Sequence, residues 1–256
     1  MADMNPRMHA LKADFIAKRD YWDGFWDGLL QLNPDFFEAY LNLSAIPWTN
    51  GVLEPKIKEF IHIAINASTT HLYEPGLRIH IQNALRYGAT KEEIMEVYQL
   101  TSVLGMHTCT MGVPALVDEF RKAGRGAEFD IPFDERRTVL KADFIEARGY
   151  WNPFWDDLLR LNPDFFEAYL RLSSIPWTNG VLEPRIKEFI YIAIDAATTH
   201  LYEPGLRVHI QNALRHGATK EEIMEVYQLT SMLGMHTCTM GVPVLIDELE
   251  KFGTPL

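Results

Sequence analysis

The sequence predicts an all-α protein made of two tandem copies of one helical domain. When the chain is displaced by 129 residues, 91 of the 110 positions in Leu11–Phe120 match those in Leu140–Leu249. A repeat of this length that occurs twice indicates a duplicated domain, because solenoid units run to about 20–50 residues and need several copies. Apolar residues recur at helical spacing, and no stretch of useful length shows the alternation typical of a strand. These observations predict two homologous helical domains that form a pseudo-dimer.

The boundary between the copies is predicted from composition. The segment Gly124–Glu135 is rich in glycine and charge and differs from its surroundings. We therefore expect a first domain at 1–125, a linker at 126–136 and a second domain at 137–256. Each unit has the common size of a domain, and 47% apolar residues can fill a core.

Charge and hydropathy exclude several classes of partner. The net charge of -11 argues against nucleic acid and anionic membranes, which attract clustered Lys and Arg. No run reaches about 18 uninterrupted apolar residues, and residues 1–13 lack the apolar core of a signal peptide. We expect a cytoplasmic protein with no membrane partner. Cys109 and Cys238 are equivalent, so neither copy holds a thiol pair, although one bridge between the copies stays open.

The first helices of each copy are predicted from spacing and caps. Met8–Tyr21 has the mixed spacing of an amphipathic helix, and Trp22–Leu32 carries an aromatic stripe typical of a core or a subunit contact. Asn33 then has the character of an N-cap before a proline. It predicts a helix over Asp35–Leu43.

The central helices follow a predicted turn. Ser44–Gly51 contains a proline and an Asn-Gly pair, which indicate a turn. Lys56–Ala67 is too apolar for a surface element, so we expect it at the centre of the domain. Leu77–Arg86 is predicted to be the next helix.

The end of that helix and the start of the next one carry strong local signals. Gly88 is expected to end the helix in a left-handed conformation. The capping box Thr90-Lys91-Glu92-Glu93 then predicts a helix over Glu93–Gly105.

His80 is the main candidate for chemistry. It falls in the second turn of the predicted helix, on its inward face. The positive end of the helix dipole disfavours the imidazolium ion there, and a neutral imidazole can take a proton. From these residues alone, a core histidine with a satisfied ring nitrogen is the plainer interpretation.

A longer pattern around His80 resembles a known family. Gly76-Leu77-Arg78-Ile79-His80, Gly88-Ala89-Thr90 and Glu92-Glu93-Ile94 are similar to the motif of the carboxymuconolactone decarboxylase and AhpD-like superfamily. The resemblance covers Asn33–Gly105 and again Asn162–Gly234. It implies an all-helical AhpD-like fold and assembly of this chain as a homo-oligomer, with a trimer of pseudo-dimers as the natural expectation.

The family includes two chemistries, and the sequence favours one of them. AhpD-like peroxidases carry a Cys-x-x-Cys pair ahead of the histidine, because one thiol attacks and the other resolves. This chain has Tyr73 and Gly76 there, so peroxidase activity is only an alternative. The decarboxylase branch implies that His80 and His209 act as acid and base on a small carboxylated lactone, without metal or organic cofactor. That branch usually has an acidic residue where this chain has Gly76 and Gly205.

Neighbouring side chains are candidates for the remaining roles. We expect tyrosine to assist a developing enolate, glutamate to orient the histidine, and arginine or a second histidine to bind the substrate carboxylate. The plainer role is a surface or interface ion pair for the arginine, and a salt bridge for the glutamate on the buried helix. The candidates to assist the enolate are Tyr73 and Tyr202, and those to orient the histidine are Glu59 and Glu188. The candidates to bind the carboxylate are Arg78, Arg207, His71 and His200.

The resemblance thus implies a lyase or isomerase acting on a small carboxylated metabolite, a lactone or keto-acid from aromatic catabolism. Two further hypotheses stay open. Histidines and acids such as His71, Glu74 and His107 could hold a zinc-like ion if folding gathers them. The repeats could instead form a non-catalytic binding or assembly module, in which case His80 should lie in filled packing without a cavity.

Overall fold

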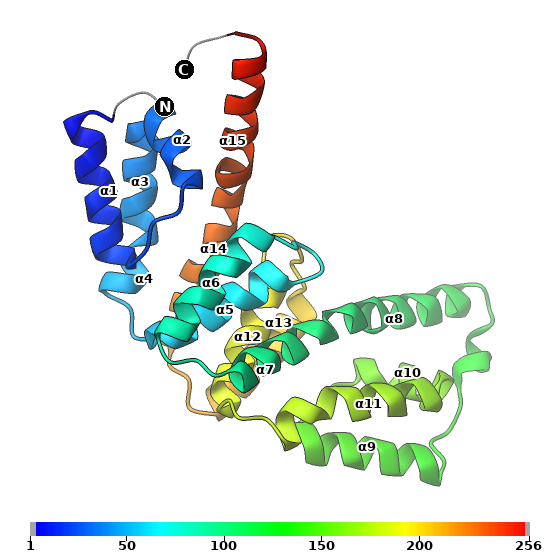
Figure 1. The fold of residues 1–256 in the computed structure, drawn as a ribbon. Coiled ribbons are helices and arrows are strands. Elements are labelled where there is room, and N and C mark those ends of the chain that lie inside the picture. The colour runs from blue at the N-terminus through cyan, green and yellow to red at the C-terminus, as the bar shows by residue number, and fades with distance from the viewer. Residues whose placement is uncertain (1–3, 254–256) are drawn as a thin grey trace.

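Helices form all the regular structure of the chain in the computed structural model, which describes residues 4–253 (Figure 1). The all-α prediction is therefore confirmed for that part of the chain. The first repeat comprises α1 (Pro6–Arg19), α2 (Phe25–Leu32), α3 (Pro34–Ser44), α4 (Ile46–Thr49), α5 (Pro55–Ala67), α6 (Glu74–Arg86), α7 (Lys91–Ser102), the 3-10 helix η1 (Val103–Met106), α8 (His107–Lys122) and η2 (Gly126–Phe129). The second comprises α9 (Glu135–Arg148), α10 (Phe154–Leu161), α11 (Pro163–Thr178), α12 (Pro184–Ala196), α13 (Glu203–Arg215), α14 (Lys220–Ser231), η3 (Met232–Met235) and α15 (His236–Lys251).

Local signals in the sequence fix most of the helix ends. The Asn33 side chain accepts a hydrogen bond from the Phe36 amide and caps α3. Thr90 and Glu93 form the expected capping box of α7. Gly88 has φ of +80°, as the predicted left-handed cap requires.

Two segments differ from the expectation. Ser44–Gly51 was expected to be a turn, but Ile46–Thr49 form the short helix α4. Pro47 falls in its first turn, where the missing amide donor costs nothing. The expected linker 126–136 also contains helix, because η2 covers Gly126–Phe129.

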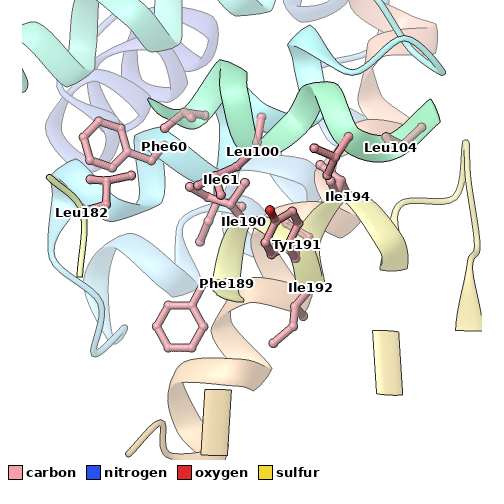
Figure 2. Close-up of a cluster of buried hydrophobic side chains, with 14 of the residues drawn as sticks. Phe60, Ile61, Leu100, Leu104, Leu182, Phe189, Ile190, Tyr191, Ile192 and Ile194 are labelled. Atoms are coloured by element: carbon pink, nitrogen blue, oxygen red, sulfur yellow. The ribbon is translucent and has the colours of Figure 1, made fainter. Parts of the chain in front are cut away.

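The core lies where the two repeats meet. The equivalent helices α5 and α12 pack against each other, and α7 and α14 pack on both of them. Phe60, Ile61, Phe189 and Ile190 fill this layer, and each is at most 1% exposed (Figure 2). The pairing of equivalent helices makes the two repeats a pseudo-dimer.

The last long helix of each repeat packs on the other repeat. α15 lies against α2, and α8 lies against α10 (Figure 1). The first three helices thus share a hydrophobic cluster with Met232, Met235, Cys238 and Val242 of the second repeat. Each repeat therefore contributes its last long helix to the packing of the other repeat.

Two continuous stretches, 91–122 and 220–251, are long and apolar enough to cross a membrane by length and composition. Core helices of soluble proteins pass the same test. In this structure both stretches pack on helices of the other repeat.

Candidate active site

A buried histidine and glutamate pair lies at the centre of each candidate site. Nδ1 of His80, on α6, lies 2.6 Å from Oε2 of Glu59, on α5. Glu59 is 1% exposed, and its Oε1 accepts a hydrogen bond of 3.2 Å from Asn83. An ionised carboxylate only accepts, so Nδ1 of a neutral His80 carries the ring proton and Nε2 carries the lone pair. That Nε2 has no hydrogen-bond partner among the described residues.

The second repeat contains the equivalent histidine and glutamate pair, with one difference in its surroundings. His209 Nδ1 lies 2.6 Å from Glu188 Oε2. Asn212, however, accepts from Arg215, and the Asn212 amide makes no bond to Glu188. We name the surroundings of His80 the first site and those of His209 the second site. Folding thus brings together the predicted histidine and glutamate in both.

Each histidine ring is covered by a second ring from the preceding helix. His62 stacks on His80 with ring centroids 4.2 Å apart, and Tyr191 stacks on His209 at 4.3 Å. Burial, helped by the nearby His80, lowers the pKa of His62 well below its usual value. His62 is therefore uncharged at neutral pH.

The predicted tyrosine and second histidine are paired with residues of the other repeat. Tyr73 Oη lies 2.6 Å from Thr239 Oγ1, and His236 stacks on Tyr73 at 4.0 Å. His71 Nε2 lies 2.6 Å from His236 Nδ1. The first site therefore needs the first turn of α15, from the second repeat.

The second site has the same construction with the repeats exchanged. Tyr202 pairs with Thr110, His107 stacks on Tyr202 at 3.9 Å, and His107 Nδ1 lies 2.6 Å from His200 Nε2. Burial lowers the pKa of His107 to about 3, and the neighbouring His200 adds to the shift. Folding thus brings His107 into the second site, not toward His71.

The predicted arginines lie outside both cavities. The Arg78 side chain is 71% exposed and donates to Glu74 on its own helix, and Arg207 does the same with Glu203. These are the surface ion pairs that the plainer interpretation expected.

A different arginine lines each cavity. Arg19, at the end of α1, is 3% exposed and lies over the Trp48 ring at 5.0 Å. Arg148 is its equivalent in the second site, at 5% exposure. Neither guanidinium has a carboxylate partner in the described residues, and Nε of both makes no hydrogen bond there. Arg19 donates one long hydrogen bond of 3.4 Å, from Nη1 to the Ser44 carbonyl. Because an unpaired buried charge is costly, these donors are suited to an anionic ligand.

The sequence contained a signal for Arg19 that the pattern analysis missed. Leu11, Phe15 and Arg19 follow one another at intervals of four, so they share one face of α1, and all three are buried. A cation at the end of an apolar stripe indicates a buried polar site.

The glycines ahead of His80 and His209 also have a structural reason. A Cβ at Gly205 would lie 2.4 Å from Oδ2 of Asp195, and one at Gly76 would lie 3.0 Å from Oδ1 of Asn66. In the second site, the Asp195 carboxylate therefore occupies the space that an acidic side chain at Gly205 would need. The first site has an amide in that place.

Both cavities are small and partly enclosed. Each has a volume of about 30 Å³, which is room for a water molecule or two. Typical ligand pockets are about 300–1,000 Å³. The helices that cover each site must move apart before a substrate of several carbons can enter. Cys109 and Cys238 are free thiols and do not line either cavity.

Comparisons with known proteins agree with the fold. A family model described as the carboxymuconolactone decarboxylase family matches residues 34–115 and 163–235. A crystal structure from Burkholderia xenovorans LB400, described as a candidate gamma-carboxymuconolactone decarboxylase subunit, is 45% identical with a TM-score of 0.92. That match covers 97% of this chain and 99% of the other. A protein of Paracoccus denitrificans, described as uncharacterized protein 4 in the cox locus, is 36% identical over 59 residues. Those residues are 23% of this chain and 51% of that relative, so the match spans about half of the relative's length.

Proposed function

Because the chain belongs to the carboxymuconolactone decarboxylase family, we propose that it is a lyase or isomerase acting on a small carboxylated lactone or keto-acid. The observation that carries this proposal is the His80–Glu59 pair, whose unpartnered Nε2 lies beside a cavity. The same cavity is lined by Arg19, which has no carboxylate partner among the described residues. Proton transfer by an oriented imidazole needs no organic cofactor.

In this mechanism Arg19 binds a carboxylate of the substrate, since a guanidinium can donate two parallel hydrogen bonds to it. His80 Nε2 takes a proton from the carbon next to a carbonyl, and Glu59 stabilises the imidazolium ion that forms. Return of the proton to another carbon gives isomerisation. In a decarboxylation, the carbon–carbon bond breaks, its electron pair stays on the substrate as an enolate, CO2 leaves, and a protonated His80 supplies the proton to that carbon.

Tyr73 stabilises the enolate in this proposal. Thr239 lies within hydrogen-bond distance of the phenol oxygen. When Thr239 donates to that oxygen, the phenol proton is left for the developing oxyanion. His209, Glu188, Tyr202 and Arg148 take the same roles in the second site.

The test is turnover of a panel of carboxylated lactones and keto-acids in D2O, with CO2 release and deuterium uptake followed together. Replacing both His80 and His209 by Gln should lower both rates by about 100-fold or more, because general acid–base catalysis contributes about that much. The exposed His9 replaced by Gln is the matched control. Undiminished turnover in the double variant would remove these histidines from the mechanism.

The same assay distinguishes the two arginine positions. Arg19→Met with Arg148→Met should raise KM at least about tenfold, because the carboxylate loses its charged partner. If Arg78→Gln with Arg207→Gln raises KM instead, the carboxylate binds at the start of α6 and α13, as the sequence pattern first indicated.

A further inference from the structure

The two sites differ at a buried position beside the paired histidines. Asn66 of the first site donates from Nδ2 to the His62 carbonyl at 2.8 Å. The equivalent residue of the second site is Asp195, which has no such donor when ionised. The two histidines nearest this position are equivalent, His71 with His236 in the first site and His200 with His107 in the second. The change from amide to carboxylate between them therefore needs a physical reason.

The Asp195 side chain lacks a hydrogen-bond partner within residues 4–253. It is 1% exposed, and both of its carboxylate oxygens are buried without a donor. An ionised carboxylate in this position costs several kcal/mol unless a cation or donors compensate it. Arg148 and Asp195 form no ion pair within the part of the chain that the structure describes.

Two imidazoles lie next to this carboxylate. His107 Nδ1 is 3.6 Å from Asp195 Oδ1 and 2.6 Å from His200 Nε2. One atom from each of the three side chains falls within 4.8 Å of the others. Ligand atoms in a tetrahedral zinc site lie roughly 3.3 Å apart, so the histidine nitrogens need to separate by about 0.7 Å. The carboxylate must also move closer, because the three ligand atoms lie within 4.8 Å of one another before an ion is bound.

We infer that the second site binds one divalent transition-metal ion of the Zn²⁺ class through His107, Asp195 and His200. Two imidazoles and one carboxylate are a ligand set of open zinc sites, which leave a fourth position free. The nitrogen ligands argue against Mg²⁺ and Ca²⁺, which prefer oxygen. The first site has His71 and His236 in equivalent places but Asn66 instead of a carboxylate, and it stays metal-free.

The ion links parts of the chain that are far apart in sequence. His107 begins α8 in the first repeat, whereas Asp195 is on α12 and His200 follows that helix in the second repeat. Metal binding therefore fastens α8 onto the second site, beside Tyr202 and Gly205. Of the two sites, only the second then has its covering helix, α8, held in place by a metal ion.

The experiment measures metal content and affinity rather than activity, so its result is independent of the proposed function. Tag-free protein is stripped with a chelator, dialysed against Zn²⁺ and assayed by elemental analysis, with calorimetric titration for affinity. We expect one ion per chain and a higher Tm with Zn²⁺, because a ligand bound by the folded state stabilises it. Co²⁺ provides a second readout, since its visible absorption reports the coordination geometry.

The asymmetry of the chain supplies matched variants. Asp195→Asn copies the first site and should weaken Zn²⁺ binding by about 100-fold or more, because loss of a residue that only orients a metal ligand already costs about 10–100-fold. Asn66→Asp should create a second site and raise the content to two ions. His71→Ala, in the first site of the otherwise wild-type chain, should leave the content at one ion. His200→Ala removes a ligand of the second site at a partly exposed residue, so it tests that site without changing a buried side chain.

Two outcomes would overturn the inference. One is wild-type protein that takes up no Zn²⁺ while its circular dichroism shows a folded chain. The other is equal Zn²⁺ affinity in the wild type, Asp195→Asn and His200→Ala. Either result would show that Asp195 does not serve as a metal ligand.

Discussion

At the scale of single residues, position 62 shows how one substitution changes the electrostatics of an otherwise repeated site. His62 is 4% exposed, and its Nε2 makes no hydrogen bond in the described residues. Its equivalent is Tyr191, whose pKa is raised to about 12 by burial, so it stays neutral across the physiological range. His62 alone of the two can gain a proton when the pH falls.

This difference predicts a pH-dependent stability. The pKa of His62 is depressed in the folded state, whereas in the unfolded chain it is about 6.5, so the unfolded chain binds more protons below that pH. Stability from His62 is therefore present above about pH 6.5 and is lost as the pH falls. Between pH 7 and pH 5 the loss should reach about 2 kcal/mol, because each pKa unit corresponds to about 1.4 kcal/mol.

The matched variant is His62→Tyr, which copies the second site. Urea unfolding at pH 7, 6 and 5 should show that this variant loses about 2 kcal/mol less than the wild type on acidification. Other groups that titrate are common to both proteins and cancel in the comparison. Parallel pH profiles would show that His62 is not responsible for acid sensitivity.

Residue-scale chemistry was predictable where one helix contained the signal. His80 was placed correctly on the inward face of its helix, because spacing and caps are local. The pairing of Tyr73 with Thr239 was not predictable, since the two residues are separated by 166 positions and meet only after the repeats dock. Arg19 was missed because a cation near a helix end is more often solvated.

At the scale of elements, buried ion pairs hold the central helices together. Lys58 of α5 lies 3.0 Å from Glu225 of α14, and both side chains are less than 5% exposed. Glu225 also accepts hydrogen bonds from the Val52 and Leu53 amides, at 2.6 and 2.9 Å. Lys187 and Glu96 form the equivalent pair. Glu225 thus links α14 of the second repeat to the segment before α5 of the first. Glu96 links α7 of the first repeat to the segment before α12 of the second in the same way.

Removing one charge of such a pair should destabilise the fold strongly. Glu225→Gln leaves Lys58 charged and buried without its partner, which costs about 3–5 kcal/mol. The control is Glu74→Gln, at a surface pair with Arg78, which should change stability by no more than about 1 kcal/mol. Urea unfolding monitored by circular dichroism measures both. Equal effects of the two substitutions would show that the interrepeat pair contributes no more than a surface pair.

Helices with a clear N-cap were predicted correctly, whereas the short helix α4 was not. Strong caps at Asn33 and Thr90 fixed the starts of α3 and α7. The short α4 was predicted as a turn because Pro47 and Asn50-Gly51 indicate one, and a single helical turn carries too few residues to show a period. In the second repeat the same stretch continues α11 through Pro176.

At the scale of the whole molecule, the duplicated sequence forms two sites that each draw on both repeats. The assembly as a homo-oligomer stays a prediction. It is supported by large apolar residues that are exposed at equivalent places in the two repeats, as a symmetric interface requires. Examples with more than half of their surface exposed are Leu72 and Leu201, Met95 and Met224, and Met111 and Met240. The exchange of α8 and α15 was not predictable, because the repeat defines sequence units but not which copy each helix packs on.

That exchange leads to a prediction about half-chains. Residues 1–125 contain α1–α3 and α8 but lack α15, so a single copy leaves the cluster of α1–α3 uncovered. Because α8 and α15 are equivalent, a second copy of 1–125 can supply its α8 in place of α15. We expect this half-chain to form a dimer by helix exchange, with two copies of the first site.

The second half-chain should dimerise less well. A Cβ at Gly28 would lie 2.6 Å from Ile246, so this glycine is matched to a large residue on α15. The equivalents are Asp157 and the smaller Val117. A dimer of residues 126–256 would bring Asp157 against Ile246, and the two large side chains would overpack the contact. A dimer of residues 1–125 would bring Gly28 against Val117 and would leave only a small gap. Light scattering on each half-chain measures the difference, and Asp157→Gly should restore the second dimer. Folded monomers of 1–125 would show that the exchanged helix is not needed to cover the first site.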